Sequence, residues 1–200
     1  MHMRAVVFRK PLEPVNIETV DIDRPLRHEV LVRTVASGVC HSDLHVANGT
    51  SRYAMDRPIL MGHEGAGIVE EVGDDVTEVA PGDHVVSCPS GFCGACAQCL
   101  AGHPNLCVGG IIPRARGLPP RLAQAGQELW PHGNIGSLAE RMLLHEHSLV
   151  RIDPDIPLDR AALVGCGVLT GLGAALRTAG LEAAQTVAVF GCGGVGLSII

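Results

Sequence analysis

A group of cysteines with short gaps between them suggests a metal site within one loop. The four are Cys93, Cys96, Cys99 and Cys107, separated by two, two and seven residues. Zinc favours tetrahedral thiolate coordination, and four cysteine ligands leave no position open for a substrate. Neighbouring glycines permit the tight turns that point the sulfur atoms inward. We therefore predict a structural zinc ion held by these four residues.

Two other uses of these cysteines fit the sequence less well. Disulfide bonds require an oxidising compartment, which no other feature of the sequence supports. An iron–sulfur cluster shares the opening gaps, but the bacterial ferredoxin pattern continues with a three-residue gap and a Cys-Pro pair. Here the last gap is longer and Val108, not proline, follows Cys107. Zinc is therefore the favoured ion.

Three further residues of metal-binding type lie in glycine-containing motifs. Cys40 follows a predicted strand in the motif GVCHSD, and His63 lies at a strand edge in GHEGAG. Cys166 stands between two glycines, ahead of a predicted helix. Each residue alone has an ordinary explanation, because an isolated cysteine is most often a small buried side chain. Spacing along the chain does not show that the three meet in space.

A glycine-rich turn at residues 191–196 is typical of dinucleotide binding. Its sequence, GCGGVG, fits the pattern G-x-G-x-x-G. Residues 186–190 form an apolar run expected to be a buried parallel strand, and residues 197–200 begin an apolar helix. Such a turn brings the backbone close to a pyrophosphate at the helix N-terminus. The predicted cofactor-binding positions in the turn are Gly191, Gly193, Gly194, Val195 and Gly196.

The elements that would position these residues are mainly strands in the first part of the chain. The 25 glycines and 13 prolines indicate many short strands joined by turns. Residues 109–136 predict a long irregular loop. Strands at the observed spacing suggest a barrel-like all-β domain. The predicted strands cover residues 4–8, 15–20, 29–36, 67–72, 84–87 and 138–144.

Helical periodicity begins after residue 157. Residues 158–164 and 168–179 are predicted helices, and Gly180 is the expected C-terminal cap of the second. A buried strand and the glycine-rich turn follow. This order predicts an α/β chain in which an all-β domain precedes the start of a second unit.

Composition excludes several classes of function. The formal net charge is −6 and no Lys/Arg-rich run occurs, which argues against nucleic-acid binding. Residues 1–10 have the pattern of a strand, not of a signal peptide. No segment approaches the roughly 18 uninterrupted apolar residues of a membrane helix. Because cysteines cluster with very short gaps, as metal ligands do in cytosolic proteins, we expect a soluble cytoplasmic protein.

Taken together, these motifs resemble those of one enzyme family. The stretch GHEGAGIVEEVG at residues 62–73 is similar to the signature of the zinc-containing alcohol dehydrogenases, in the medium-chain dehydrogenase/reductase superfamily. The other motifs occur in that family's order, and the match runs from Arg4 to Ile200. The resemblance implies an α/β fold. A GroES-like all-β barrel catalytic domain would occupy residues 1–157, and residues 158–200 would be the incomplete start of a Rossmann NAD(P)-binding domain.

The resemblance also assigns a second metal site and the residues around it. It implies that Cys40, His63 and Cys166 bind a catalytic zinc ion, so that the chain would hold two zinc ions. Glu64 matches a glutamate that lies behind this ion and can transiently coordinate it. Asp43 matches a carboxylate that orients the imidazole of His63.

Four further positions match family residues that handle protons or the cofactor. Ser42 matches the hydroxyl that takes the substrate proton, and His45 the histidine that ends the proton relay to solvent. His41 matches a position that meets the cofactor pyrophosphate, where histidine in place of arginine would weaken the contact. Thr170 matches a residue near the nicotinamide. The histidines without a matching role, interpreted as surface or loop residues, are His103, His132, His145 and His147.

The function implied by the resemblance is reversible oxidation of an alcohol to an aldehyde or ketone. The cofactor would be NAD, with NADP not excluded, because the acidic residue that holds the NAD ribose would lie beyond Ile200. The partners would be a small alcohol or aldehyde substrate and, at full length, further copies in a homodimer or homotetramer. No nucleic acid or membrane partner is expected.

Two alternatives remain open at this point. The first is a class III-like S-(hydroxymethyl)thiol (formaldehyde) dehydrogenase, because residues 108–135 resemble an insertion that class I and class III enzymes share and shorter microbial tetrameric forms lack. Its Arg114, Arg116 and Arg121 could meet an anionic thiol carrier. The second is a non-catalytic zinc-binding fragment that lacks the cofactor domain.

Overall fold

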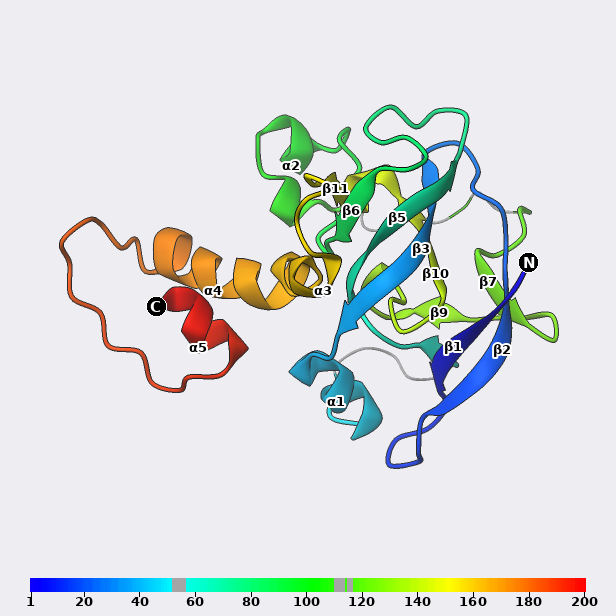
Figure 1. The fold of residues 1–200 in the computed structure, drawn as a ribbon, viewed down its shortest axis with the longest axis horizontal. Coiled ribbons are helices and arrows are strands. Elements are labelled where there is room, and N and C mark those ends of the chain that lie inside the picture. Colours follow the sequence, from blue (N-terminus) through cyan, green and yellow to red (C-terminus); the bar gives the residue numbers. More distant parts are fainter. Residues whose placement is uncertain (52–56, 110–113, 115–116) are drawn as a thin grey trace.

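The computed structural model describes residues 1–51, 57–109, 114 and 117–200 (Figure 1). The strands of this chain form two sheets. One has six strands in the order β8-β7-β2-β1-β4-β9, and the other has five in the order β10-β3-β5-β6-β11. The strands of the first sheet are β1 (His2–Phe8), β2 (Asn16–Ile22), β4 (Ile59–Leu60), β7 (Leu122–Gln124), β8 (Gln127–Glu128) and β9 (Trp130–Pro131). Those of the second are β3 (Glu29–Gly38), β5 (Glu64–Val72), β6 (His84–Ser87), β10 (Arg141–His145) and β11 (Leu149–Arg151).

The two sheets pack face to face around an aliphatic core. One buried cluster joins Val20 and Leu60 of the first sheet to Leu31 and Leu143 of the second. Alternate residues of β3, such as Val32, enter a second cluster on the other face of that strand. Since successive side chains of a strand point to opposite faces, β3 is covered on both sides and forms the centre of the barrel-like domain.

Helices connect and extend the sheets. They are α1 (His41–Ala47), α2 (Ala97–Leu100), α3 (Leu158–Ala161), α4 (Leu169–Gly173) and α5 (Gly194–Ile199). The described residues also contain the 3-10 turns η1 (Pro104–Leu106), η2 (His132–Asn134) and η3 (Glu146–Ser148) and the π-helical turns η4 (Val164–Val168) and η5 (Ala174–Thr178). Figure 1 shows α1 at one end of β3, whereas α4 and α5 lie away from the sheets.

The helical stretch Leu158–Thr178 passes through both π turns without a break. Gly180 follows it with φ of +64°, and the Leu181 N–H donates to the Ala175 carbonyl, so the predicted glycine cap is confirmed. By length and composition alone this stretch could cross a membrane. A helix of a soluble protein meets the same criterion, and Cys166 in its middle faces the sheets, as described below.

The predicted strands agree with the structure to within a few residues, but two predictions are wrong. Residues 109–136 are not one irregular loop where the structure describes them, because β7 pairs with β2 and β9 pairs in parallel with β4. Residues 186–190 form no strand and are mostly exposed. A parallel strand needs neighbours for its hydrogen bonds, and no described strand pairs with this run.

Candidate metal centres

The four-cysteine loop brings all its sulfur atoms together. The Sγ atom of Cys96 lies 3.5 Å from that of Cys99 and 3.9 Å from that of Cys107, and all four Sγ atoms lie within 4.8 Å of one another. The Cys96 N–H points at Cys93 Sγ at 3.3 Å, and the Cys93 N–H points at Cys107 Sγ at the same distance. Backbone N–H groups directed at sulfur favour the thiolate form, which is the form that binds zinc.

Thiol acidity in this loop follows the same contacts. Backbone N–H groups of Cys99 and Val108 lower the pKa of Cys96 to about 5. Burial, and then the neighbouring Cys96, raise the pKa of Cys99 to about 11. Four adjacent thiols therefore do not all ionise easily by themselves, because the negative thiolates repel one another. A divalent cation between them would stabilise all four thiolates. The donor set fits a closed tetrahedral zinc site.

The second predicted group also assembles, from three separate elements. Cys40 precedes α1 at the end of β3, His63 directly precedes β5, and Cys166 lies in the π turn η4. The Sγ atoms of Cys40 and Cys166 are 4.0 Å apart although the residues are 126 positions apart in sequence. One ligand atom each from Cys40, His63, Glu64 and Cys166 falls within the same 4.8 Å.

A glycine lets Cys166 reach this position. A β-carbon at Gly165 would lie 1.8 Å from the carbonyl oxygen of Ser87, so the helix can approach β6 only because residue 165 has no side chain. Cys166 lies within the helical stretch. The prediction that it stands ahead of a helix is wrong.

The chemistry of the Cys40 group fits a zinc ion. Two sulfur atoms and one imidazole match the Cys2His set of a catalytic zinc site, which keeps one coordination position open. Burial, then the charges of Cys40 and Glu64, raise the pKa of Cys166 to about 12. A cation between the two thiols would reverse that effect, because it stabilises both thiolates. Glu64 is 4% exposed, and one of its carboxylate oxygens lies within 4.8 Å of the ligand atoms of Cys40, His63 and Cys166.

Asp43 occupies a buried position next to His63. Its carboxylate accepts the backbone N–H of Cys40 at 2.9 Å and that of Gly62 at 3.2 Å, and it lies 3.5 Å from His63 Nδ1. Burial raises the pKa of Asp43, but the hydrogen bond from His132 and the contact with His63 outweigh burial and hold it well below its usual range. Asp43 is therefore ionised near neutral pH.

His132 belongs to this site, although it was interpreted as a surface or loop residue without a role; it lies in the turn η2 and is 6% exposed. Its Nδ1 lies 2.7 Å from Asp43 Oδ1, and its ring meets that of His63 edge-on, with centroids 4.8 Å apart. His145 was also misplaced, because it is 8% exposed and packs against His147. His103 is exposed and His147 half-buried. No local signal could have found His132, since its contacts join turns far apart in sequence.

The residues assigned to proton transfer all lie on α1. Ser42 Oγ is 3.7 Å from Cys40 Sγ, so this hydroxyl borders the metal group. His45 Nδ1 lies 2.9 Å from Thr50 Oγ1, and the His41 and His45 rings meet edge-on with centroids 4.9 Å apart. Ser42, His41 and His45 are exposed, as contact with substrate, cofactor and solvent would require.

The glycine-rich turn has the backbone shape that its pattern predicts. Gly191 has φ of +99°, and a β-carbon at Gly196 would lie 1.9 Å from the Gly191 carbonyl oxygen. The helix α5 starts directly after Gly193. Thr170 is exposed on α4, which contacts α5 through Gly171. The turn and its helix are thus present without a flanking strand.

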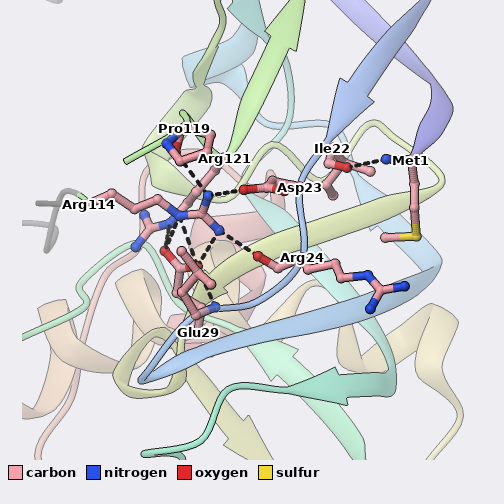
Figure 2. A network of polar contacts seen from close by, with 9 residues as sticks. Met1, Ile22, Asp23, Arg24, Glu29, Arg114, Pro119 and Arg121 are labelled. Atoms are coloured by element: carbon pink, nitrogen blue, oxygen red, sulfur yellow. Dashed lines mark hydrogen bonds and ion pairs between the residues drawn. The ribbon is translucent and has the colours of Figure 1, made fainter. Parts of the chain in front are cut away.

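The arginines predicted to meet a thiol carrier are instead bound within the protein (Figure 2). Arg114 donates to Glu29 at 2.6 Å and also contacts Asp23, and Arg121 donates to Glu29 at 2.7 Å. The three central side chains of this network are 6–11% exposed. Burial raises the pKa of Glu29, but hydrogen bonds from both arginines lower it overall. Arg116 lies outside the described residues.

Comparison with protein families gives a match over the all-β part of the chain. The alcohol dehydrogenase GroES-like domain matches residues 26–154, which is more than half of the chain. Among curated proteins, the chain is 42% identical to S-(hydroxymethyl)glutathione dehydrogenase of Saccharomyces cerevisiae, over 98% of the chain and 52% of that protein. It is 39% identical to NDMA-dependent alcohol dehydrogenase of Amycolatopsis methanolica, over 100% of the chain and 54% of that protein.

Solved structures give the same result. An alcohol dehydrogenase zinc-binding domain protein from Burkholderia ambifaria superposes with a TM-score of 0.87 at 36% identity, covering 99% of this chain and 54% of that one. Benzyl alcohol dehydrogenase from Acinetobacter calcoaceticus gives a TM-score of 0.87 at 32% identity and the same coverage. The chain spans about half the length of the relatives that it matches.

Proposed function

We propose that this chain, which belongs to the zinc-containing alcohol dehydrogenases of the medium-chain dehydrogenase/reductase superfamily, serves the reversible oxidation of an alcohol with NAD(P). The product is an aldehyde or ketone. The observation that carries this proposal is the convergence of Cys40, His63 and Cys166, with Ser42 beside them. Because the chain spans about half of its relatives, the activity is proposed for the whole protein.

The proposed roles follow from where the side chains lie. When bound, zinc supplies a Lewis acid that polarises the substrate oxygen, and the nicotinamide accepts hydride. Ser42 receives the proton of the substrate hydroxyl, because its own hydroxyl borders the metal group at the exposed start of α1. Ser42 would release its own hydroxyl proton through the cofactor ribose to His45, one turn further along α1, and His45 would release a proton to solvent. Asp43 holds the imidazole of His63 in place.

The proposed cofactor contacts come from two places. The turn at residues 191–196 offers backbone N–H groups at the start of α5 to the pyrophosphate, and His41 on α1 offers an imidazole to it. Thr170 is exposed on α4, where the nicotinamide end would lie. NAD is the proposed cofactor, with NADP as the alternative, and the cytoplasm is the proposed compartment. The proposed assembly of the full-length protein is a homodimer or homotetramer.

The Cys166→Ala substitution tests the metal centre of this proposal. In the complete enzyme it should abolish alcohol oxidation while one zinc ion per chain remains in the four-cysteine loop. Cys88→Ala is a matched control, since Cys88 is also half-buried but belongs to neither metal group. Metal content and NADH formation are measured on both variants. Full activity of Cys166→Ala would refute the proposed site.

A second candidate function is favoured by the names of two sets of relatives. The proteins from Saccharomyces cerevisiae and Escherichia coli are S-(hydroxymethyl)glutathione dehydrogenases. Against a thiol-carrier role for the arginines, Arg114 and Arg121 already bind Glu29. The two functions are distinguished by comparing turnover of formaldehyde, with and without glutathione or mycothiol, with turnover of benzyl alcohol. Formaldehyde oxidation that depends on the thiol would favour the second candidate.

A further inference from the structure

The buried carboxylate of Asp43 is held from three directions. Its oxygens accept the backbone N–H of Cys40, itself a predicted metal ligand, and that of Gly62, the residue before the ligand His63. The third donor is the side chain of His132, whose Nδ1 lies 2.7 Å from Oδ1. That same oxygen is the one 3.5 Å from His63 Nδ1. His132 and His63 therefore share one carboxylate oxygen.

His132 also touches His63 directly. The two rings meet at 78° with centroids 4.8 Å apart, and the His132 side chain is 6% exposed. The next residue, Gly133, has φ of +58°, and a β-carbon there would lie 2.8 Å from the β-carbon of His63. The turn η2 is thus packed against the imidazole, both through Asp43 and through its own backbone.

The orientation of His63 decides whether a metal can bind. Its Nδ1 faces Asp43, which leaves Nε2 for the ion shared with Cys40 and Cys166. An imidazole that rotates about its side-chain bonds would withdraw Nε2 from the two sulfur atoms. The rotation is resisted on one side by the Asp43 oxygen and on another by the edge of the His132 ring.

We propose that His132 is a positioning residue for the metal centre: its N–H fixes the Asp43 carboxylate, and this carboxylate holds the His63 imidazole toward Cys40 and Cys166. The inference rests on the proposed function, because it concerns the same metal site. Changing the outer partners of metal ligands typically lowers metal affinity 10–100-fold. Loss of the His132 donor should therefore weaken this centre and leave the four-cysteine centre unchanged.

Two substitutions separate the hydrogen bond from the ring contact. His132→Phe keeps a planar ring next to His63 but removes the N–H donor. His132→Asn removes the ring but keeps a donor close to the place of Nδ1, because the asparagine amide nitrogen is similarly placed. The proposal predicts that His132→Asn retains the metal affinity of the wild type and that His132→Phe weakens it.

The measurement is release of metal from the purified 200-residue chain by graded chelator, with Zn²⁺ and again with Co²⁺. Release from the wild type should occur in two steps, which Cys166→Ala and Cys99→Ser assign by removing one step each. For His132→Phe, the step of the Cys40 group should shift to 10–100-fold lower chelator concentration. The Co²⁺ absorption spectrum of that step should also change, whereas His132→Asn should remain within a few-fold of the wild type.

Each other result counts against the proposal. Equal affinities of His132→Phe and wild type would refute it, and so would equal losses for Phe and Asn. Loss of both metals from His132→Phe would show a general folding defect instead of positioning. A wild-type chain that releases metal in one step only would refute the proposed function itself, which is a different result from the first three.

Discussion

At Gly133 the backbone turns directly against His63, which gives this position a steric requirement. A Gly133→Ala change should cost about 3 kcal/mol of unfolding free energy, because a positive φ and an overlap with His63 both oppose the new side chain. Gly82 has φ of +95° but open space around it, so Gly82→Ala should cost only about 1 kcal/mol. Urea unfolding of both variants measures the difference, and equal costs would contradict the overlap.

The free energy of unfolding should depend on pH through His145. Burial, then the nearby His147 and His28, lower the pKa of His145 to about 4, below the usual 6.5. The unfolded chain therefore binds a proton between these values that the folded chain does not. Its contribution to stability is complete above pH 6.5 and is lost as the pH falls toward 4, by about 2–3 kcal/mol.

The variant His145→Asn tests this dependence. Asparagine has no titrating group but can still accept the His147 N–H that His145 Nδ1 accepts. Unfolding free energies of the variant and the wild type are compared across pH 4–7. Their difference should change by that amount over this range, and a constant difference would contradict the assignment.

The metal ligands and the carboxylate of Asp43 next to them could be predicted from the sequence, but the further partner of Asp43, His132, could not. Cys40, His63 and Cys166 stand in motifs with a family order, so resemblance was sufficient to group them. His132 has no motif, and its contact with Asp43 depends on how η2 folds back across the barrel. A short-range pattern carries no information on such a contact.

Among the elements, the network around Glu29 connects Arg114 and Arg121, which directly precedes β7, to the start of β3 (Figure 2). In an Arg114→Met variant Glu29 keeps Arg121 as a partner, so the change removes hydrogen bonds to a charged group without leaving the carboxylate unpaired. Such a loss costs about 1.5–3 kcal/mol, and Arg114→Met should lower the unfolding free energy by roughly that amount. Arg4→Met is the control, since the Arg4 side chain is 72% exposed in its pair with Glu140 and should cost less than about 1 kcal/mol.

Strand prediction succeeded where side-chain alternation and pairing agree, as in β1, β3 and β6. It failed for residues 186–190, because an apolar run indicates a buried strand only if neighbouring strands exist to pair with it. The sequence also predicted no helix at α1. This helix begins where Asp43 accepts the N–H of Cys40 and so caps its N-terminus. That capping pattern uses Cys and Asp in place of the commoner Ser/Thr and Glu.

For the whole molecule, cofactor binding by these 200 residues depends on how the glycine-rich turn is held. The glycine-rich turn is formed, but residues 181–193 contain no helix or strand and are mostly exposed. We expect that NADH does not titrate this chain to saturation, because the turn lacks a sheet to hold it in place. Fluorescence titration with NADH measures this. Tight binding would rule out the alternative of a non-catalytic zinc-binding fragment.

The placement of the two cysteine groups gives them different mechanical effects. Cys93 and Cys107 are 14 positions apart, whereas Cys40 and Cys166 are 126 positions apart and connect β3 to the long helix. An ion at the second group would cross-link two segments that are far apart in the sequence. By analogy with cross-links, closing loops of these sizes removes about 3 and 5 kcal/mol of chain entropy from the unfolded state. Stripping that ion should therefore accelerate amide hydrogen exchange throughout Leu158–Thr178, and emptying the first loop should not.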